Sequence, residues 1–178
     1  MKTIVIYKSK YGATRVYAQW IGEELSCPVI DAKSVKPADL KAFDTIIYGG
    51  GLYAEVIAGV TLITKNFNIL KDKKIIIYTT GLTPPQIRDY YDKIVPEKNF
   101  KNGLPDNVRV FNFSGKMIME ELSLPHKAAI SMLKKIMVKK ENPTEMERLL
   151  IDLCDSNGDF TDRSQITELL EYARKQGE

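Results

Sequence analysis

A hydroxyl-rich hexapeptide that contains a glycine, residues 9–14 (SKYGAT), lies between the first apolar run of the chain and a segment with helical spacing. A loop that opens onto a helix N-terminus directs unpaired backbone N–H groups and the positive end of the helix dipole into one place, where anions bind. The hydroxyls of Ser9 and Thr14 add donors, and Gly12 permits a tight turn and a close backbone approach. We therefore predict a site for a single phosphate.

Other phosphate-binding motifs do not fit this loop. The dinucleotide fingerprint GxGxxG needs more glycines, and the P-loop needs a GK[ST] ending, which the chain lacks at any expected strand-to-helix turn. An alternative is that Ser9 and Thr14 only cap the helix. The position of the loop after the first expected strand favours the ligand site, because open parallel sheets bind ligands beyond the carboxyl ends of their strands.

Two further loops are expected at the same edge of the sheet. Residues 48–53 (YGGGLY) end the third apolar run, and residues 79–83 (TTGLT) end the fourth. The three glycines are expected to supply mobile backbone amides beside a planar ligand, including a peptide bond that could flip, and Tyr53 supplies a ring to cover one face. The alternative is a tight turn next to a core tyrosine.

Five short apolar runs rich in Ile, Val and Tyr would position these loops. None alternates strictly between apolar and polar residues, which is typical of strands that are buried on both faces by helices. They therefore predict a parallel sheet. The runs are residues 3–8, 28–31, 45–48, 74–79 and 108–113.

Segments with helical spacing lie between these strands. Residues 14–25 carry Ala18, Ile21 and Leu25 on one face, and residues 85–94 are expected to form a further helix. The alternation of strands and helices predicts one doubly wound α/β domain, residues 1–178, with five parallel strands. Right-handed crossovers leave few topologies, and the order 2-1-3-4-5, a common doubly wound arrangement, is the one we expect.

The last expected helix covers residues 163–176. Asp162 and Gln165 have the spacing of a capping box, in which each side chain bonds the backbone N–H of the other. An apolar stripe at helical spacing would face the core. Its members are Ile166, Leu169, Leu170 and Ala173.

An insertion at about residues 116–157 interrupts the alternation before the last helix. Pro125 is placed to start a helix that runs to about Lys140, and residues 144–154 are expected to form another. The apolar face of this second helix would consist of Met146, Leu149, Leu150 and Leu153.

Composition and charge narrow the function classes. The 178 residues carry a net charge of +3 without a basic tail or arginine stripe, which disfavours nucleic acid as a partner. The N-terminal apolar run is too short for a signal peptide, and no stretch approaches the roughly 20 apolar residues that span a bilayer. We expect a cytoplasmic protein whose membrane contacts, if any, are peripheral.

No metal site is expected. Cys27 and Cys154 are far apart in the sequence and lack CxxC spacing, so they predict neither a zinc site nor a redox dithiol. The segment that begins at Asp155 resembles the start of a calcium loop, but Phe160 stands where that loop requires glycine and Ile166 where it requires glutamate.

The three loops together resemble those of the flavodoxin family: a hydroxyl-rich loop that ends in G-x-T, a glycine–aromatic loop and a polar glycine loop. The order of elements is most similar to the flavodoxin-type, oxygen-independent protoporphyrinogen oxidases, which carry an extra segment before the last helix. The resemblance implies a flavodoxin-like fold with a noncovalent FMN. The implied phosphate ligands are Ser9, Tyr11, Gly12, Ala13 and Thr14, with Lys10 and Arg15 nearby, and the implied ring contacts are Gly50, Gly51, Leu52, Tyr53, Thr80, Gly81 and Leu82.

Three function classes follow from this resemblance. The first is an FMN-dependent oxidoreductase that acts on a porphyrinogen or a quinone-type substrate. The second is an electron-transfer protein with a redox partner, which the mildly basic charge disfavours because electron-carrying flavodoxins are usually acidic. The third is a flavin-free binding domain on the same fold.

Neither the sole histidine nor the insertion is assigned a catalytic role. Since a flavin supplies the redox chemistry itself, no acid–base residue is required, and His126 is expected to be an ordinary exposed histidine. The lysine-rich insertion has two interpretations: a docking surface for an anionic substrate, an acidic redox partner or a membrane, and a solvated lysine face over a packed helix.

Overall fold

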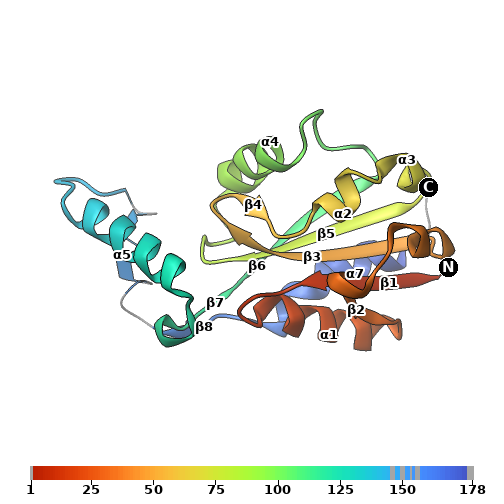
Figure 1. The fold of residues 1–178 in the computed structure, drawn as a ribbon, viewed down its shortest axis with the longest axis horizontal. Helices are drawn as coiled ribbons and strands as arrows, with labels where there is room; N and C mark the ends of the chain where they lie inside the picture. The colour runs from red at the N-terminus through yellow and green to blue at the C-terminus, as the bar shows by residue number, and fades with distance from the viewer. Residues whose placement is uncertain (1, 145–146, 149–150, 153, 155–156, 176–178) are drawn as a thin grey trace.

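The computed structural model describes residues 2–144, 147–148, 151–152, 154 and 157–175. Its main sheet has six strands, five of them parallel in the order β2-β1-β3-β5-β6, which confirms the predicted order 2-1-3-4-5 for the parallel strands (Figure 1). The parallel strands are β1 (Thr3–Lys8), β2 (Val29–Asp31), β3 (Thr45–Tyr53), β5 (Lys74–Gly81) and β6 (Val108–Ser114). The sixth strand, β4 (Val56–Ile57), pairs antiparallel with β3 and was not expected.

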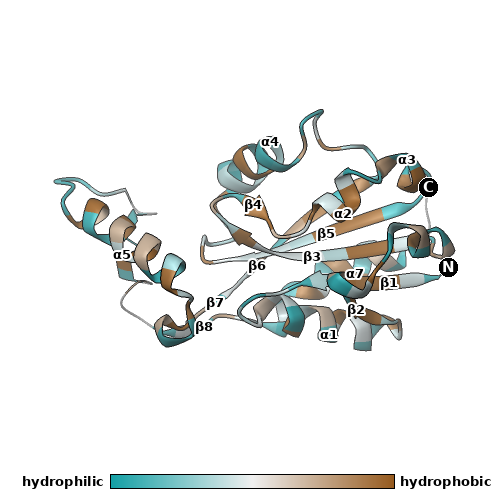
Figure 2. Cartoon of the chain, viewed as in Figure 1, coloured by the Kyte–Doolittle hydropathy of each residue, from teal (hydrophilic) through white to brown (hydrophobic). Residues whose placement is uncertain are grey.

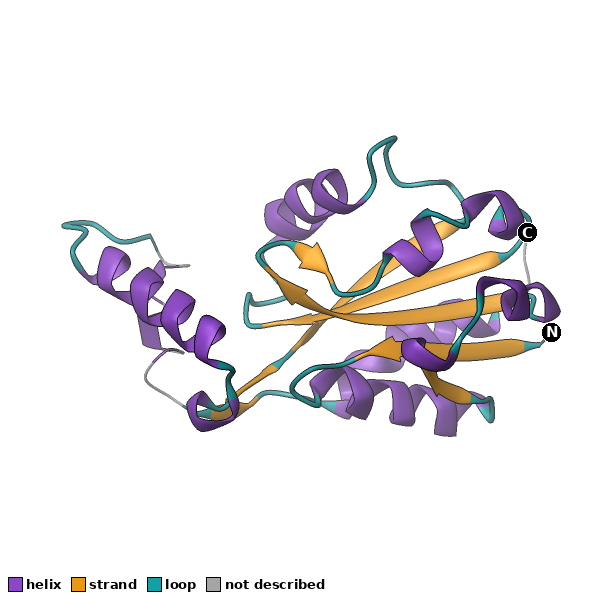
Figure 3. Cartoon of the chain, viewed as in Figure 1, coloured by secondary structure: helices purple, strands orange, loops and turns teal. Residues whose placement is uncertain are grey.

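Side chains from successive strand residues pack on opposite faces of the sheet, as the two-residue period of a strand requires. In β1, Ile4 and Ile6 belong to one buried cluster and Val5 belongs to the other. Because both faces are covered by helices, these strands carry near-continuous apolar runs. The core therefore has two layers, one on each side of the sheet (Figure 3).

The two faces are covered by different helices. On one face lie α1 (Ala13–Leu25) and α7 (Thr167–Arg174), and on the other lie α2 (Thr61–Thr64), α3 (Phe67–Leu70) and α4 (Val95–Asn99) (Figure 1). The helix expected from residue 14 is confirmed as α1.

The helix expected at residues 85–94 is displaced toward the C-terminus. Helical geometry begins at residue 88, continues as a π-helical segment over Tyr90–Ile94 and ends with α4. Before it, a turn is closed by the bond from the N–H of Ile87 to the carbonyl of Pro84 at 3.1 Å. This turn occupies the residues that were expected to form the first turn of the helix, so the helix begins at residue 88 instead of Pro85.

The last helix begins with a 3-10 turn, Arg163–Ile166, followed by α7. Asp162 caps this turn by accepting the N–H of Ser164 at 2.8 Å, but Gln165 does not complete the predicted capping box. Its side chain instead accepts the N–H of Ser114 at 2.8 Å and so ties the helix to the end of β6. The predicted core stripe is confirmed, with Ile166, Leu169, Leu170 and Ala173 all buried.

The insertion leaves the body through a two-stranded antiparallel ribbon, β7 (Lys116–Met117) with β8 (Gly158–Asp159), and carries α5 (Leu124–Val138). Pro125 lies in the first turn of α5, as predicted. The apolar face expected at residues 144–154 (Met146, Leu149, Leu150 and Leu153) lies outside the described residues. Within the described ranges, no helix has both the length and the apolar character needed to cross a membrane.

The arrangement places several loops together. The carboxyl ends of the parallel strands point toward the same end of the molecule, and α5 lies beyond that end (Figure 1). The loop before α1, the ends of β3 and β5, and the insertion are therefore neighbours there, although they are far apart in the sequence.

Candidate functional site

The N-terminus of α1 is open. Gly12 precedes the helix with φ at 97°, a conformation that favours glycine, and its N–H donates to Ser9 Oγ at 3.1 Å. No side chain caps the helix, and the N–H groups of residues 13–15 bond no acceptor in the part of the chain that the structure describes. The alternative that Ser9 and Thr14 only cap this helix is therefore wrong. Free N–H groups at a helix N-terminus form an anion site.

Thr14 holds this helix end against the sheet. Its hydroxyl bonds the hydroxyl of Thr80 at 2.7 Å, and its carbonyl accepts the hydroxyl of Tyr78 at 2.9 Å. Thr14 and Thr80 are both buried. Thr14 thus fixes the first turn of α1 to β5. Because its hydroxyl already bonds Thr80, the donors that remain for an anion at this helix end are backbone N–H groups.

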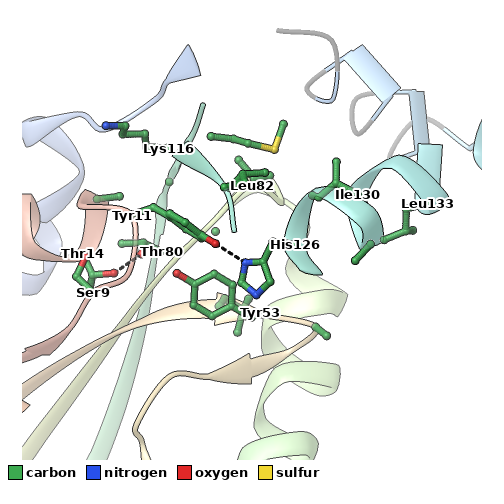
Figure 4. Close-up of a pocket in the computed structure, with 18 residues that line it drawn as sticks. Ser9, Tyr11, Thr14, Tyr53, Thr80, Leu82, Lys116, His126, Ile130 and Leu133 are labelled. Carbon is green, nitrogen blue, oxygen red and sulfur yellow. Dashed lines mark hydrogen bonds between the residues drawn. The ribbon is translucent and has the colours of Figure 1, made fainter. Parts of the chain in front are cut away.

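A cavity of about 300 Å³ lies beside this helix end (Figure 4). Nine of the predicted site residues line it: Ser9, Tyr11, Ala13, Thr14, Leu52, Tyr53, Thr80, Gly81 and Leu82. The insertion contributes the opposite wall, including Leu122, His126, Ala129, Ile130 and Leu133. The cavity is therefore mostly apolar and is shared by the sheet edge and the inserted helix.

An adjoining hollow is more polar. Ser9, Tyr11 and Lys116 line both the cavity and the hollow. Gly12 and the cationic side chains of Lys10 and Arg15 line the hollow but not the cavity. Lys116 forms an ion pair with Glu121 at 3.1 Å. The carboxylates of Asp31 and Glu121 also line the hollow, so its cations outnumber its carboxylates by one. A ligand with an anionic end and an apolar end would match the two spaces, because the hollow has a small positive excess and the cavity is mostly apolar.

Gly50 and Gly51 do not form the mobile loop that the sequence predicts. Both lie within β3, where Gly50 pairs with Lys8 on one side and Thr79 on the other, and neither lines the cavity or the hollow. A Cβ at Gly50 would lie 2.5 Å from Ile57 Cγ2, so this glycine makes room for β4. A peptide flip here would break the hydrogen bonds between β3 and its neighbouring strands, so the structure argues against the predicted flip.

An aromatic cluster of Tyr11, Tyr53 and His126 stands in the cavity (Figure 4). Tyr11 Oη and His126 Nδ1 are 2.7 Å apart, and the rings of Tyr53 and His126 have centroids 5.2 Å apart. The expectation of an ordinary exposed histidine is therefore wrong. No spacing signal could have revealed this contact, since Tyr11 and His126 are brought together only by the insertion.

Burial and neighbouring charge set the protonation of this cluster. Burial, together with Tyr11, raises the pKa of Tyr53 to about 12. Burial acts to raise the pKa of Tyr11, but hydrogen bonds with Ser123 and Lys10 outweigh it and leave the pKa below its ordinary value. Burial and then the charge of Lys10 lower the pKa of His126. A neutral His126 can accept the hydroxyl proton of Tyr11 at Nδ1.

We expect His126 to titrate below the ordinary histidine pKa in a nuclear magnetic resonance titration, which is simple because the chain has one histidine. Since the unfolded chain binds the proton more readily, the stability of the folded state falls as pH drops through the ordinary histidine pKa toward the lower folded-state pKa. Lys10→Gln should raise the His126 pKa, whereas the control Lys101→Gln should not. An ordinary pKa, unchanged by Lys10→Gln, would contradict this account.

A family model described as a flavodoxin domain matches residues 4–145, which is most of the chain. The chain belongs to the flavodoxin domain family. A comparison with curated proteins found no significant match.

Solved flavodoxin-like structures are similar to the chain at low identity. A flavodoxin from the domain Archaea is 17% identical over 87% of this chain and 97% of that chain, with a TM-score of 0.44. Flavodoxin 1 from Bacillus cereus is 17% identical over 68% and 89%, with a TM-score of 0.45. The flavodoxin, WrbA-like protein from Agrobacterium tumefaciens is 16% identical over 86% and 95%, with a TM-score of 0.44.

Proposed function

We propose that this member of the flavodoxin domain family binds FMN noncovalently and is an FMN-dependent oxidoreductase. The observation that carries the proposal is the uncapped N-terminus of α1, which opens beside an apolar cavity at the carboxyl edge of the sheet. Ligands of open parallel sheets bind at this edge.

The residues present fit the phosphate of FMN. The N–H groups of residues 13–15 and the hydroxyl of Ser9 would donate to it, and Lys10 and Arg15 would balance its charge. At Gly12, the position that a Cβ would occupy has no atom within 4 Å, so the backbone there leaves room for a ligand.

The cavity fits the flavin ring. Leu52 and Leu82 would contact the ring, Tyr53 would cover one face, and Ile130 and Leu133 of the insertion would exclude water. When bound, FMN supplies hydride or single-electron transfer. The neutral His126 would keep the Tyr11 hydroxyl oriented in the cavity.

The insertion supports an enzyme rather than an electron carrier. It walls the cavity with His126, Ala129, Ile130 and Leu133, so it would shield the bound flavin on that side from a redox partner protein. The net charge of +3 agrees with this choice. A porphyrinogen or a quinone, the substrates that the sequence resemblance implies, are the first to test.

Turnover by the purified FMN-loaded protein tests the proposal. Oxidation of a porphyrinogen with an added quinone as the electron acceptor, or reduction of a soluble quinone by an added electron donor, would support the enzyme. FMN uptake without turnover of either substrate, combined with electron exchange with a redox partner protein, would support the electron-transfer alternative. Failure to bind FMN would leave a flavin-free binding domain.

A further inference from the structure

The inserted helix α5 exposes an unusual amount of apolar side chain. Nine large apolar side chains are exposed among the described residues, and five of them belong to α5. These are Leu124 (81% exposed), Met132 (65%), Leu133 (51%), Ile136 (51%) and Val138 (58%). The helix projects from the body of the molecule, and Figure 2 shows hydrophobic colour along it. A helix that only packed on the body would bury such residues.

Three of these side chains form one strip, which we call the apolar strip: Met132, Leu133 and Ile136. Their spacing of one and four residues places them on neighbouring positions of the helix surface. Leu133 also lines the cavity, so the strip continues from the surface to the cavity wall. The strip is therefore joined to the proposed flavin site.

Lysines flank the strip, and carboxylates are absent from it. Residues 124–140 contain five lysines and no aspartate or glutamate. Lys135 and Lys139 are exposed and lie one turn apart, on the side of the helix next to Met132. Apolar residues beside lysines on one helix are the pattern of helices that lie in the interface of an anionic membrane.

We propose that α5 docks on an anionic lipid surface. The apolar strip would enter the boundary between headgroups and acyl chains, while Lys135 and Lys139 would contact lipid phosphates. A second copy of this chain is disfavoured as the occupant, because pairing two such faces would bring lysines of the same charge together. Because Leu133 also lines the cavity, docking would bring that wall of the cavity close to the lipid, where a lipid-soluble reactant would be concentrated.

Cosedimentation of the full chain with vesicles tests this inference, with or without FMN. We expect binding to vesicles of equal parts phosphatidylserine and phosphatidylcholine, weak binding to pure phosphatidylcholine, and loss of binding at high salt. Lys135→Glu/Lys139→Glu and, separately, Met132→Glu/Ile136→Glu should each reduce the partition coefficient about tenfold or more. All four side chains are exposed, so the fold should be retained.

Matched controls lie outside the insertion. Lys101→Glu removes an exposed lysine and Leu104→Glu an exposed leucine, and both variants should bind vesicles like the unaltered chain. Equal loss in these controls, equal binding to neutral and anionic vesicles, or no vesicle binding at all would overturn the proposal. The proposal would also be overturned if the chain failed to bind vesicles but self-associated without lipid, and if Met132→Glu/Ile136→Glu abolished that self-association.

Discussion

Ser9→Asp is expected to weaken FMN binding about 100- to 1000-fold while leaving the fold intact. Ser9 lines both the cavity and the polar hollow, beside the open N-terminus of α1. A carboxylate there would repel the phosphate, and a like-charge pair about 4 Å apart in a partly screened site opposes binding by roughly 3–4 kcal/mol. The helix itself should tolerate the change, because a negative charge near its N-terminus is stabilising.

Ser9→Asn is the matched control for this prediction. It has nearly the same shape as aspartate without the charge, so its effect on FMN affinity should be much smaller. Riboflavin, which lacks the phosphate, should lose far less affinity for Ser9→Asp than FMN does. A parallel loss for the two flavins, measured by fluorescence titration, would refute the phosphate site at this helix end.

Gly49→Ala is expected to lower the free energy of unfolding by about 3 kcal/mol. An added Cβ would lie 2.0 Å from Cζ of Tyr78, which is the register partner of Gly49 on β5. Tyr78 is fully buried and donates its hydroxyl to the Thr14 carbonyl, so the ring cannot move without disturbing the first turn of α1. The midpoint of urea unfolding measures the loss.

Two further variants test whether the loss of stability comes from the clash with Tyr78 or would follow any substitution of a strand glycine. Gly81→Ala places its Cβ at 3.5 Å from Leu52, an ordinary contact, and should cost about 1 kcal/mol or less. In a double-mutant cycle, Tyr78→Val should make Gly49→Ala much less harmful, because the obstructing ring is gone. Additive effects of the two substitutions would mean that the contact between Gly49 and Tyr78 is not the cause.

The parallel sheet could be predicted because burial on both faces imposes a simple pattern on its strands. The start of β1 at Thr3 and that of β5 at Lys74 follow directly from their apolar runs. The β3–β4 hairpin could not be predicted, since its turn is formed by Ala54 and Glu55 at positive φ, where Asn-Gly or Asp-Gly would be the usual signal. Asn99, at the end of α4 and far away in the sequence, stabilises this turn by accepting the N–H of Ile57 and donating to the carbonyl of Glu55.

The candidate site was predictable where local sequence determines it. The loop at residues 9–14 contains its own turn glycine and precedes a helix, so the expectation of an anion site there, and the open helix end that the structure shows, follow from short-range rules. The triple glycine was misread because its glycines make room for Tyr78 and Ile57, which are distant partners. His126 was missed for the same reason, since its contact with Tyr11 depends on how the insertion folds back.

The visible absorbance spectrum of the purified protein, recorded before and after adding FMN and removing the excess, tests the central claim most directly. We predict flavin bands that remain with the protein after gel filtration and are altered from those of free FMN by the apolar cavity around Tyr53. A colourless protein that also fails to retain added FMN would contradict the account, because the open helix end and the cavity would then not form a flavin site.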